Sequence, residues 1–346
     1  MTNKLLYSSL AAAALLCCSA QAQTAKPAKA EPAMQKVLDA LGSLGGKPIE
    51  TLTPQEARLQ PTPADAVKKV LTQMGKSTAP EAGVTVKDMM IAGPLGDFPI
   101  HIYTPEGTGP FPVMVYYHGG GFVIADTKVY DASPRALAKM AKAVIVAVDY
   151  HRAPEHKFPA APNDAYAAYQ WTLKNAKSIN GDAARVAVGG ESAGGNLATV
   201  VSMMARDKKE PMPVHQLLVY PVVNDDMENA SYKKYADAKP LNKPMMAWFF
   251  KHYGGDPKNA YALPMKAASL KGLPSATVIA AEIDPLLTEG KAYADRLKKD
   301  GVAVTYKHYD GVAHEFFGMG AVVPAAKDAE QFAADALTKA FGKTAR

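Results

Sequence analysis

The sequence predicts an α/β domain in which helices cover both faces of a mostly parallel β-sheet. The 346-residue chain has 48% hydrophobic and 21% charged residues, the composition of a globular protein with a large core. After residue 83, short apolar runs alternate with segments of helical period. Because a helix between two strands returns the chain to the same end of the sheet, this alternation favours parallel strands.

The strand-like runs are short, apolar and rich in β-branched or aromatic residues, whereas the helical segments are longer. We expect the first strands to form an antiparallel edge of the sheet. The expected strands are 84–90, 98–103, 113–117, 143–148, 186–188, 217–223, 276–281 and 302–309. The expected helices in this part of the chain are 133–142, 163–177, 193–206, 287–299 and 325–341.

Two further regions are expected to form a helical cap over the sheet. Residues 34–82 contain apolar residues at helical spacing on either side of a proline-containing stretch, which predicts two helices before the main domain at 83–346. Residues 225–271 interrupt the alternation and contain clustered methionine and aromatic side chains. This cluster either lines a pocket or packs against the domain, and both interpretations stay open. It comprises Met245, Met246, Trp248, Phe249, Phe250 and Tyr253.

The N-terminus has the features of an export signal. Lys4 precedes a nearly unbroken apolar run at 5–16, and Ala20-Gln21-Ala22 fits a small-x-small cleavage site. We therefore expect residues 1–22 to be a signal peptide and the mature protein to be periplasmic or secreted. The apolar run is shorter than the roughly 20 residues of a spanning helix, so stable membrane insertion is not expected. Residues 23–33, rich in Ala, Lys and Pro, are expected to form a flexible linker.

Both cysteines, Cys17 and Cys18, lie inside the expected signal peptide. The mature chain would then have no thiol with which to form a disulfide, so its stability would rest on the core. A lipid anchor on Cys18 is the alternative interpretation. Leu16 and Cys17, directly before that position, disfavour it.

The charge of the chain gives little support to a nucleic-acid-binding function. The formal net charge is +6, but Lys and Arg form no run of five or more and no basic stretch is interleaved with aromatic residues. We expect a solvated basic surface and no nucleic-acid partner. Weak attraction to anionic surfaces stays open.

The clearest chemical signal is Gly190-Glu191-Ser192-Ala193-Gly194, between a predicted strand and a predicted helix. A G-x-S-x-G sequence in that position is typical of a nucleophile elbow, a tight turn that exposes the serine above the sheet. Gly190 and Gly194 remove the side chains that would clash in such a turn. Ser192 is therefore the candidate nucleophile, and a glycine-rich turn without chemical function is the alternative.

A second glycine-rich run is the candidate oxyanion hole. His118-Gly119-Gly120-Gly121 directly follows the predicted strand 113–117. Acyl transfer requires N–H groups that stabilise a negative oxygen, and glycines let the backbone approach that oxygen. We expect Gly120, Gly121 and Ala193 to donate these hydrogen bonds, with His118 and Gly119 as supporting parts of the motif. A phosphate-binding loop is the alternative, but the run matches neither G-x-G-x-x-G nor a Walker motif.

A serine hydroxyl needs a base, and in this kind of site the chain order is serine, acid, histidine. His308 lies in a predicted strand, His252 in the expected cap, and His215 at the start of a strand. His314 lies in a loop just past the last predicted strand, where a side chain can reach Ser192. His314 is therefore the candidate general base.

The candidate acid is Asp284, which ends the predicted strand before the sequence Pro285-Leu286. At that position its carboxylate can accept a hydrogen bond from His314 and hold the ring in the required tautomer. Asp225 or Asp226, after the preceding strand, is the rival and stays open.

Together these motifs resemble the bacterial hormone-sensitive-lipase family (family IV) of carboxylesterases, which has the α/β-hydrolase fold. The resemblance covers about residues 85–342 and rests on His118 to Phe122, Gly190 to Gly195, Asp284-Pro285-Leu286 and the His314 loop. The segment from Asp149 to Glu155 is similar to the family's Asp-Tyr-Arg-Leu-Ala-Pro-Glu, with His151 and Arg152 in place of Arg-Leu; Arg152 and Glu155 are interpreted as structural. Glu191 stands where Asp or Thr is more usual, which leaves the subfamily open.

The resemblance implies a serine carboxylesterase that acts on small-molecule esters with short- to medium-chain acyl groups, and aryl esters stay open. It implies an acyl-enzyme and no cofactor, and the sequence has no His/Asp/Glu cluster with metal-ligand spacing. It also implies that the cap is built from 34–74 and 225–271. A peptidase or amidase of the same fold and a non-catalytic ligand-binding protein are the alternatives. A homodimer is compatible with the sequence.

Overall fold

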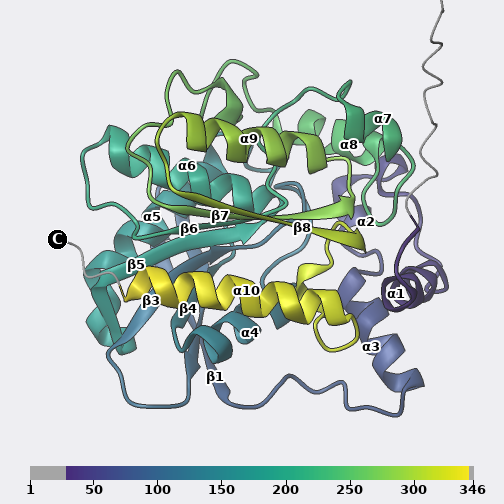
Figure 1. The fold of residues 1–346 in the computed structure, drawn as a ribbon, viewed down its shortest axis with the longest axis horizontal. Coiled ribbons are helices and arrows are strands. Elements are labelled where there is room, and N and C mark those ends of the chain that lie inside the picture. The colour runs from purple at the N-terminus through teal and green to yellow at the C-terminus, as the bar shows by residue number, and fades with distance from the viewer. Residues whose placement is uncertain (1–28, 343–346) are drawn as a thin grey trace, which may run out of the picture.

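An eight-stranded β-sheet forms the centre of the protein (Figure 1). The computed structural model describes residues 29–342. The strands follow the order β1-β2-β4-β3-β5-β6-β7-β8, and only β2 runs against the others. The expected parallel sheet with an antiparallel edge is confirmed. The strands are β1 (Val84–Gly93), β2 (Gly96–Pro105), β3 (Phe111–Tyr117), β4 (Val144–Val148), β5 (Gly181–Glu191), β6 (Gln216–Val219), β7 (Ala276–Ile283) and β8 (Val304–Ala313).

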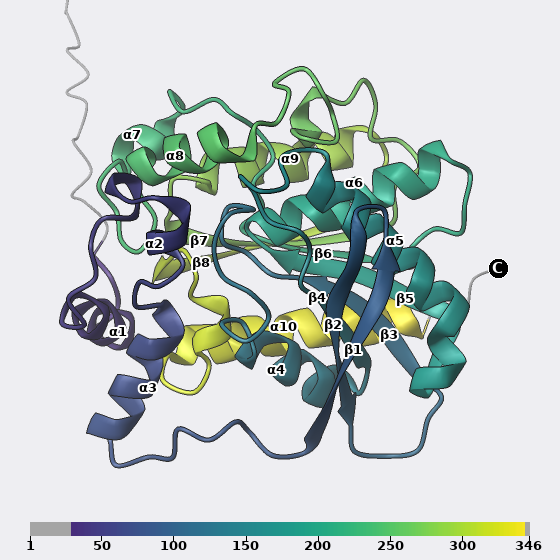
Figure 2. The same ribbon diagram turned by 180° about the vertical axis from the view of Figure 1, so that it is seen from behind.

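The helices of the main domain lie on both faces of the sheet (Figure 1, Figure 2). On one face α4 and α10 pack together over a buried apolar core, and on the other face α5, α6 and α9 cover a second core. The central strand β4 is buried along its whole length, which explains its unbroken run of Val, Ile and Ala. These helices match the expected ones and are α4 (Ala132–Ala141), α5 (Ala160–Asn175), α6 (Ala193–Asp207), α9 (Leu287–Lys299) and α10 (Pro324–Phe341).

Several strands differ in length from the expected ones, and the differences at β5 and β6 bear on the site. β5 begins at Gly181 rather than at 186, because its first residue still pairs with β3. β6 ends at Val219 rather than at 223, because Tyr220 adopts a φ of 34° and the chain leaves the sheet there. Val222 N then donates a hydrogen bond of 3.1 Å to the carbonyl oxygen of Ser192. The segment after β6 is therefore packed against the turn that follows β5.

The N-terminal cap contains the two expected helices, α1 (Pro32–Gly42) and α3 (Pro63–Gln73), with short turns η1 (Ile49–Thr51) and α2 (Pro54–Ala57) between them. The expected linker at 23–33 was too long at its C-terminal end, because α1 already begins at Pro32, a residue suited to the first helical position. The remainder of that linker up to residue 28, and the expected signal peptide with both cysteines, lie outside the described residues.

The second cap segment contains α7 (Ala230–Lys234), α8 (Lys243–Tyr253) and the single turn η3 (Pro264–Lys266). In both views α7 and α8 lie at the same end of the molecule as α1 to α3, beyond the carboxyl ends of the parallel strands (Figure 1, Figure 2). Trp248 of α8 donates a hydrogen bond of 3.1 Å from Nε1 to the carbonyl oxygen of Leu52. This bond joins the two cap segments.

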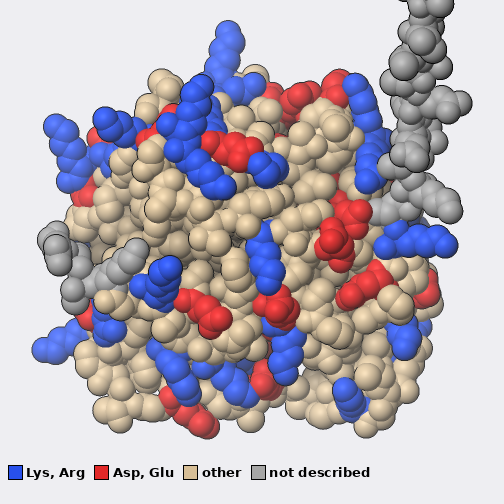
Figure 3. All heavy atoms as spheres, viewed as in Figure 1, with Lys and Arg blue, Asp and Glu red and all other residues tan. Residues whose placement is uncertain are grey.

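On the face shown in Figure 3, Lys and Arg side chains are interspersed with Asp and Glu side chains. The basic residues there do not merge into one continuous surface. Within residues 29–342, none of the helices combines the length and the apolar character that a membrane span requires.

Arg58 at the end of α2 fastens the N-terminal cap to the main domain. Its guanidinium donates to the carbonyl oxygens of Val123 and Ala153, both at 2.8 Å, and forms an ion pair of 2.6 Å with Glu155. The ion pair with Arg58 lowers the pKa of Glu155 to about 2. Val123 belongs to the loop that contains Gly120 and Gly121, so Arg58 connects the cap to the candidate oxyanion hole.

We expect Arg58→Met to lower the free energy of unfolding by about 2 kcal/mol, because two carbonyl oxygens and a carboxylate lose a charged donor. Limited proteolysis should then cut residues 43–75 faster than in the wild-type protein. Arg185→Met is the control, because Arg185 bonds Asp182 and the carbonyl oxygen of Pro110, away from the cap. Equal cleavage of 43–75 in both variants would contradict the anchoring role.

Candidate active site

Ser192 lies at the sharp turn between β5 and α6, with φ 57° and ψ −115°. This conformation is strained for a residue with a side chain and recurs where a structure fixes a functional group. The turn is tight because the backbone of Gly194 runs against β3. A Cβ atom on Gly194 would lie 1.9 Å from the carbonyl oxygen of Tyr117, and one on Gly190 would lie 2.3 Å from the same atom. Only glycine fits either position.

Three side chains predicted from widely separated segments form one hydrogen-bonded chain. The Nε2 atom of His314 is 3.0 Å from Ser192 Oγ, and its Nδ1 atom is 2.7 Å from Asp284 Oδ2. All three residues are buried. The other carboxylate oxygen of Asp284 accepts the backbone N–H of Leu286 at 2.8 Å, which fixes the carboxylate at the end of β7. The arrangement has the geometry of nucleophile, base and orienting acid.

The electrostatic environment of His314 favours its protonated form. Burial by itself lowers the pKa of His314, but the charge and hydrogen bond of Asp284 outweigh this effect. The charges of Glu315 and Glu191 act in the same direction as Asp284, and the pKa is raised above its usual value. The ring is therefore well suited to take up a proton.

The rival acids have other partners. Asp225 forms an ion pair of 3.1 Å with Lys266, and Asp226 accepts the backbone N–H of Glu228 at 2.9 Å. The structure thus joins Asp284, and neither rival, to His314 by a hydrogen bond.

The other downstream histidines also lie in different contacts. The ring of His252 packs on Trp248 in α8, and His308 lies beside Asp310 at 3.4 Å in β8. His215 is bonded to Ser275 and Thr277 next to the start of β6. Each position agrees with the sequence reasoning that set these residues aside.

The loop after β3 places two glycines in the lining of the same cavity as Ser192. Gly120 and Gly121 have φ values of 91° and 58°, in the region that glycine adopts without strain. The carbonyl oxygen of Gly120 accepts the N–H groups of Val123 and Ile124, which closes the loop into a turn. Ala193 is the first residue of α6, so its N–H has no partner within the helix. The N–H groups of Gly120, Gly121 and Ala193 therefore remain the candidate donors for a negative oxygen at Ser192.

His118 supports this loop rather than reacting. Its Nδ1 atom lies 2.7 Å from the carbonyl oxygen of Gly119, and its ring stacks on Tyr150 with centroids 4.3 Å apart. Burial lowers the pKa of His118, so the ring is neutral. Asp149 accepts the backbone N–H and the hydroxyl of Thr127, both at 2.6 Å, and so fixes the far end of the same loop. The sequence identified this segment only by resemblance.

Three more side chains surround the site, and sequence reasoning assigned none of them a role in it. Glu191 is buried and accepts the hydroxyls of Tyr116 and Tyr220, both at 2.5 Å. Burial raises the pKa of Glu191 to about 7, although the tyrosine hydrogen bonds oppose the shift.

Tyr130 donates its hydroxyl to both carboxylate oxygens of Glu315 at 2.7 Å. Glu315 follows His314 directly, but adjacency in sequence does not show on which side of the ring its carboxylate lies.

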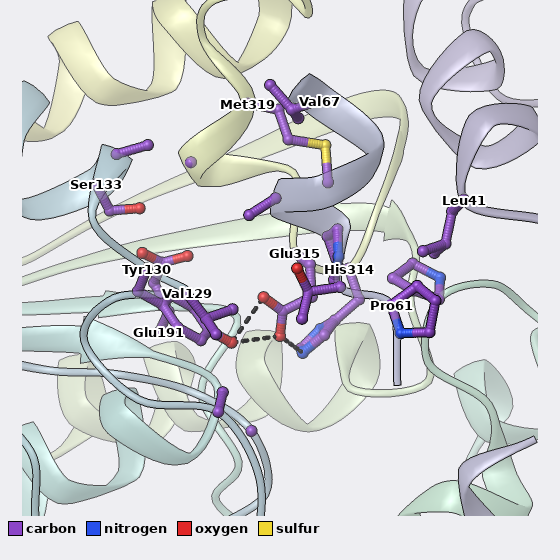
Figure 4. A pocket seen from close by; sticks show the side chains of 18 of the residues that line it. Leu41, Pro61, Val67, Val129, Tyr130, Ser133, Glu191, His314, Glu315 and Met319 are labelled. Atoms are coloured by element: carbon purple, nitrogen blue, oxygen red, sulfur yellow. Dashed lines mark hydrogen bonds and ion pairs between the residues drawn. The ribbon is translucent and has the colours of Figure 1, made fainter. Parts of the chain in front are cut away.

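A cavity of about 1890 Å³ lies over Ser192 and His314 and extends beneath the N-terminal cap (Figure 4). Apolar side chains from α1 and α3, such as Leu41 and Val67, form part of its wall together with Met319. The clustered methionine and aromatic side chains of the second cap segment are divided between the cavity wall and the core. Met245, Met246 and Phe249 line the cavity, whereas Trp248 and Tyr253 are buried in the core and Phe250 packs against it.

The cavity contains no arrangement that would select a metal. Among residues 29–342, no group of three or more His, Cys, Asp or Glu side chains is placed to hold a metal ion. The lining of the cavity includes Ser192 and His314 together with the carboxyls of Glu191 and Glu315.

Comparisons with known proteins identify the family of the chain. A profile of the α/β-hydrolase fold family matches residues 114–318. The carboxylic ester hydrolase LipN of Mycobacterium tuberculosis is 39% identical over 69% of this chain and 66% of its own length. An ethyl acetate hydrolase of Pseudomonas putida is 30% identical over 86% of this chain and 94% of its own length.

Solved structures extend the agreement to nearly the whole described chain. The crystal structure of a thermostable esterase from Pseudomonas putida superposes with a TM-score of 0.81 and 38% identity, covering 90% of this chain and 98% of the esterase. From the profile, the relatives and this superposition together, it follows that the chain belongs to the hormone-sensitive-lipase family within the α/β-hydrolase fold.

Proposed function

We propose that the protein hydrolyses carboxylic esters through a covalent acyl-enzyme on Ser192. As a member of a family whose matched relatives are ester hydrolases, it is a carboxylic ester hydrolase. The observation that supports the serine mechanism is the hydrogen-bonded chain from Ser192 through His314 to Asp284 at the base of a large cavity. The serine mechanism and the substrate range are the parts of the proposal that go beyond family membership.

In the acylation step, Ser192 Oγ adds to the carbonyl carbon of the ester while its proton moves to His314 Nε2. Asp284 keeps the other ring nitrogen protonated and stabilises the imidazolium that forms. The negative oxygen of the tetrahedral intermediate accepts hydrogen bonds from the N–H groups of Gly120, Gly121 and Ala193. Loss of one such donor costs about 2.7–4 kcal/mol of transition-state stabilisation in related chemistry. Collapse of the intermediate expels the alcohol, which takes the proton from His314.

Deacylation repeats the same chemistry with water as the nucleophile. His314 removes a proton from the water as its oxygen adds to the acyl carbon, and the same N–H groups hold the oxyanion. When this intermediate collapses, the carboxylic acid leaves and Ser192 Oγ regains its proton from Nε2. The cycle needs no group other than the triad, the loop N–H groups and water.

We propose that the substrates are small esters with short- to medium-chain acyl groups, and aryl esters stay open. The loop after β3 that contains Gly119, Gly120 and Gly121 is called the oxyanion loop. Phe249 lies so close to it that a Cβ atom on Gly121 would be 2.3 Å from the Phe249 ring. An aromatic ring beside the reacting carbonyl limits bulk there, whereas the apolar side chains farther out can accept a chain. We regard the alternative functions, an amidase and a non-catalytic binding protein, as outcomes of the first test below.

We also propose that residues 1–22 direct export and are removed, so that the mature enzyme acts in the periplasm or outside the cell. The support for this proposal is the short apolar run followed by Ala20-Gln21-Ala22. Self-association into a homodimer is compatible with the proposal and is not required by it.

Replacing the nucleophile gives the first test of the mechanism. Ser192→Ala should lower kcat for p-nitrophenyl butyrate by on the order of 10⁴-fold or more. In the wild-type protein, butyrate should be cleaved faster than palmitate in an acyl series, and an aminoacyl p-nitroanilide should be cleaved slowest. Ser202→Ala is the control, because Ser202 is a buried serine of α6, the helix that follows Ser192, and its hydroxyl donates to the carbonyl oxygen of Ala198. Faster anilide cleavage would indicate an amidase, and unchanged turnover in Ser192→Ala would rule out this nucleophile.

The pH dependence of kcat/KM tests the base and the acid. Because His314 must be neutral to accept a proton and its pKa is raised, activity should fall as the pH drops through a midpoint above 6.5. Asp284→Asn removes the largest raising effect, so the midpoint should move to lower pH and kcat should fall by roughly 10⁴-fold. Asp225→Asn should leave both values near wild type, and the reverse result would assign the acid to Asp225.

Export is tested by the mass of the protein recovered from a bacterial host's periplasm. Cleavage after Ala22 predicts an N-terminus at Gln23 and a mature chain without cysteine. Ala22→Arg should block cleavage, because signal peptidases require a small residue there, whereas Ala28→Arg should not. A lipid-modified N-terminus at Cys18, or an uncleaved chain in the cytoplasm, would disprove this part of the proposal.

A further inference from the structure

The ring of His314 has a carboxylate beside each of its two nitrogens. Asp284 bonds Nδ1 at 2.7 Å, as described above. On the opposite side, Oε1 of Glu315 lies 3.6 Å from Nε2, the same nitrogen that faces Ser192 Oγ at 3.0 Å (Figure 4). A separation of 3.6 Å is too long for a hydrogen bond but short enough for a strong charge interaction.

Tyr130 holds the carboxylate of Glu315 in this position. Figure 4 shows its hydroxyl directed at both carboxylate oxygens, each at 2.7 Å. Tyr130 lies just before α4, and its hydroxyl is so close to the oxyanion loop that a Cβ atom on Gly119 would be 2.2 Å from it. The Tyr130–Glu315 pair therefore links the oxyanion loop to the loop that contains the base.

The backbone of Glu315 also indicates that its placement is enforced. Its φ is 69°, a left-handed conformation that a residue with a long side chain rarely adopts. Such strain persists only where the surrounding structure determines the conformation. The side chain is 19% exposed and lines the cavity, so it is neither in bulk solvent nor sealed in the core.

The other ionisable groups near the ring do not duplicate this contact. Glu191 on β5 affects His314 through its charge, but both its oxygens are occupied by the hydroxyls of Tyr116 and Tyr220. The ring of Tyr220, after β6, packs against His314 with centroids 4.4 Å apart. Asp284, after β7, is on the far side of the ring.

The charged groups that face Glu315 are His314, Asp284 and Glu191, and Tyr130 donates its hydroxyl to the carboxylate. The pKa of Glu315 is raised, because burial and the charge of Asp284 raise it more than the charge of a protonated His314 and the Tyr130 hydroxyl lower it. Protonation of His314 and ionisation of Glu315 therefore promote each other.

We propose that Glu315 is a positioning residue that acts through His314: held by Tyr130, its carboxylate stabilises the imidazolium formed when Nε2 takes the proton of Ser192, and keeps Nε2 directed at the reacting atoms. The inference rests on the proposed serine mechanism. Asp284 would orient the ring from Nδ1, and Glu315 would supply negative charge at the nitrogen that gains the proton. No bond to Glu315 forms or breaks during the reaction.

Glu315→Gln tests the charge, because glutamine preserves the shape and can still accept the Tyr130 hydroxyl. We expect kcat for p-nitrophenyl butyrate to fall about tenfold with KM changed less than twofold, since the ester does not need this charge to bind. The acid limb of the kcat/KM profile should move about one pH unit lower, because an opposite charge at this distance shifts a pKa by roughly that much.

Tyr130→Phe tests the orientation in a second variant, in which the carboxylate remains but its donor is lost. It should shift kcat and the acid limb in the same direction as Glu315→Gln. The matched controls are Tyr166→Phe and Glu210→Gln, a tyrosine–glutamate pair bonded at 2.6 Å outside the cavity, and neither should alter the pH profile.

Titration with an organophosphonate that labels the active serine separates this inference from the proposed function. If wild-type Ser192 is not labelled, the serine mechanism itself fails. If labelling is stoichiometric in every variant but the acid limb stays at the wild-type pH in Glu315→Gln and Tyr130→Phe, the role of Glu315 is disproved, even if kcat falls for structural reasons.

Discussion

Close contact between the backbone of α6 and the end of β3 is the constraint on which the site depends. The first turn of α6 lies directly against the carbonyl oxygen of Tyr117, and only glycine at 190 and 194 permits that approach. The contact forces Ser192 into its strained turn, raises its side chain above the sheet and places the start of α6 beside the oxyanion loop. Because β3 and β5 are neighbours in the sheet, the loop after one and the elbow after the other meet at the same edge.

Buried and half-buried carboxyls are the second recurring feature of this edge. Asp284, Glu191 and the half-buried Glu315 surround His314, and each has hydrogen-bond donors that offset the cost of removing it from water. Another buried carboxyl, Glu289, accepts the N–H groups of residues 223 and 224 and so fixes the chain where it leaves β6. Burial, together with the charge of Glu315, raises the pKa of Glu191, and the charges of Asp284, Glu315 and Glu191 raise the pKa of His314 against the effect of burial. The site therefore stabilises a positive charge on the histidine more readily than a second negative charge.

The caps affect the chemistry through position rather than through reacting groups. Arg58 fastens the N-terminal segment to the oxyanion loop and to residues 153–155, and Trp248 fastens the two cap segments to each other. Phe249 lies against Gly121, and Leu41 and Val67 form part of the cavity wall. Changes in the cap should consequently affect both the shape of the cavity and the order of the loop that we propose to bind the oxyanion.

Local patterns in the sequence were sufficient to predict the fold class, the approximate strand and helix positions and the candidate serine, because each depends on neighbours in the chain. Periodicity reflects which face of an element is buried, and G-x-S-x-G records a backbone turn that only certain residues permit. His314 and Asp284 followed from chain order, which works because parallel strands bring their carboxyl ends to one edge. The early end of β6 and the start of α1 at Pro32 were missed, since packing on Ser192 and on β8 decides them.

Tertiary structure alone decided which distant side chains pair with one another around this site. Tyr130 and Glu315 are 185 positions apart, and Arg58 and Glu155 are 97 positions apart, so no spacing in the sequence connects them. The division of the cap aromatics between cavity and core likewise depends on the rotation of α8 against the sheet. The sequence by itself determined which residues could perform ester hydrolysis, because that depends on residue type and local backbone. Only the folded chain determined how charge is arranged around His314, because electrostatic interactions depend on distance in space.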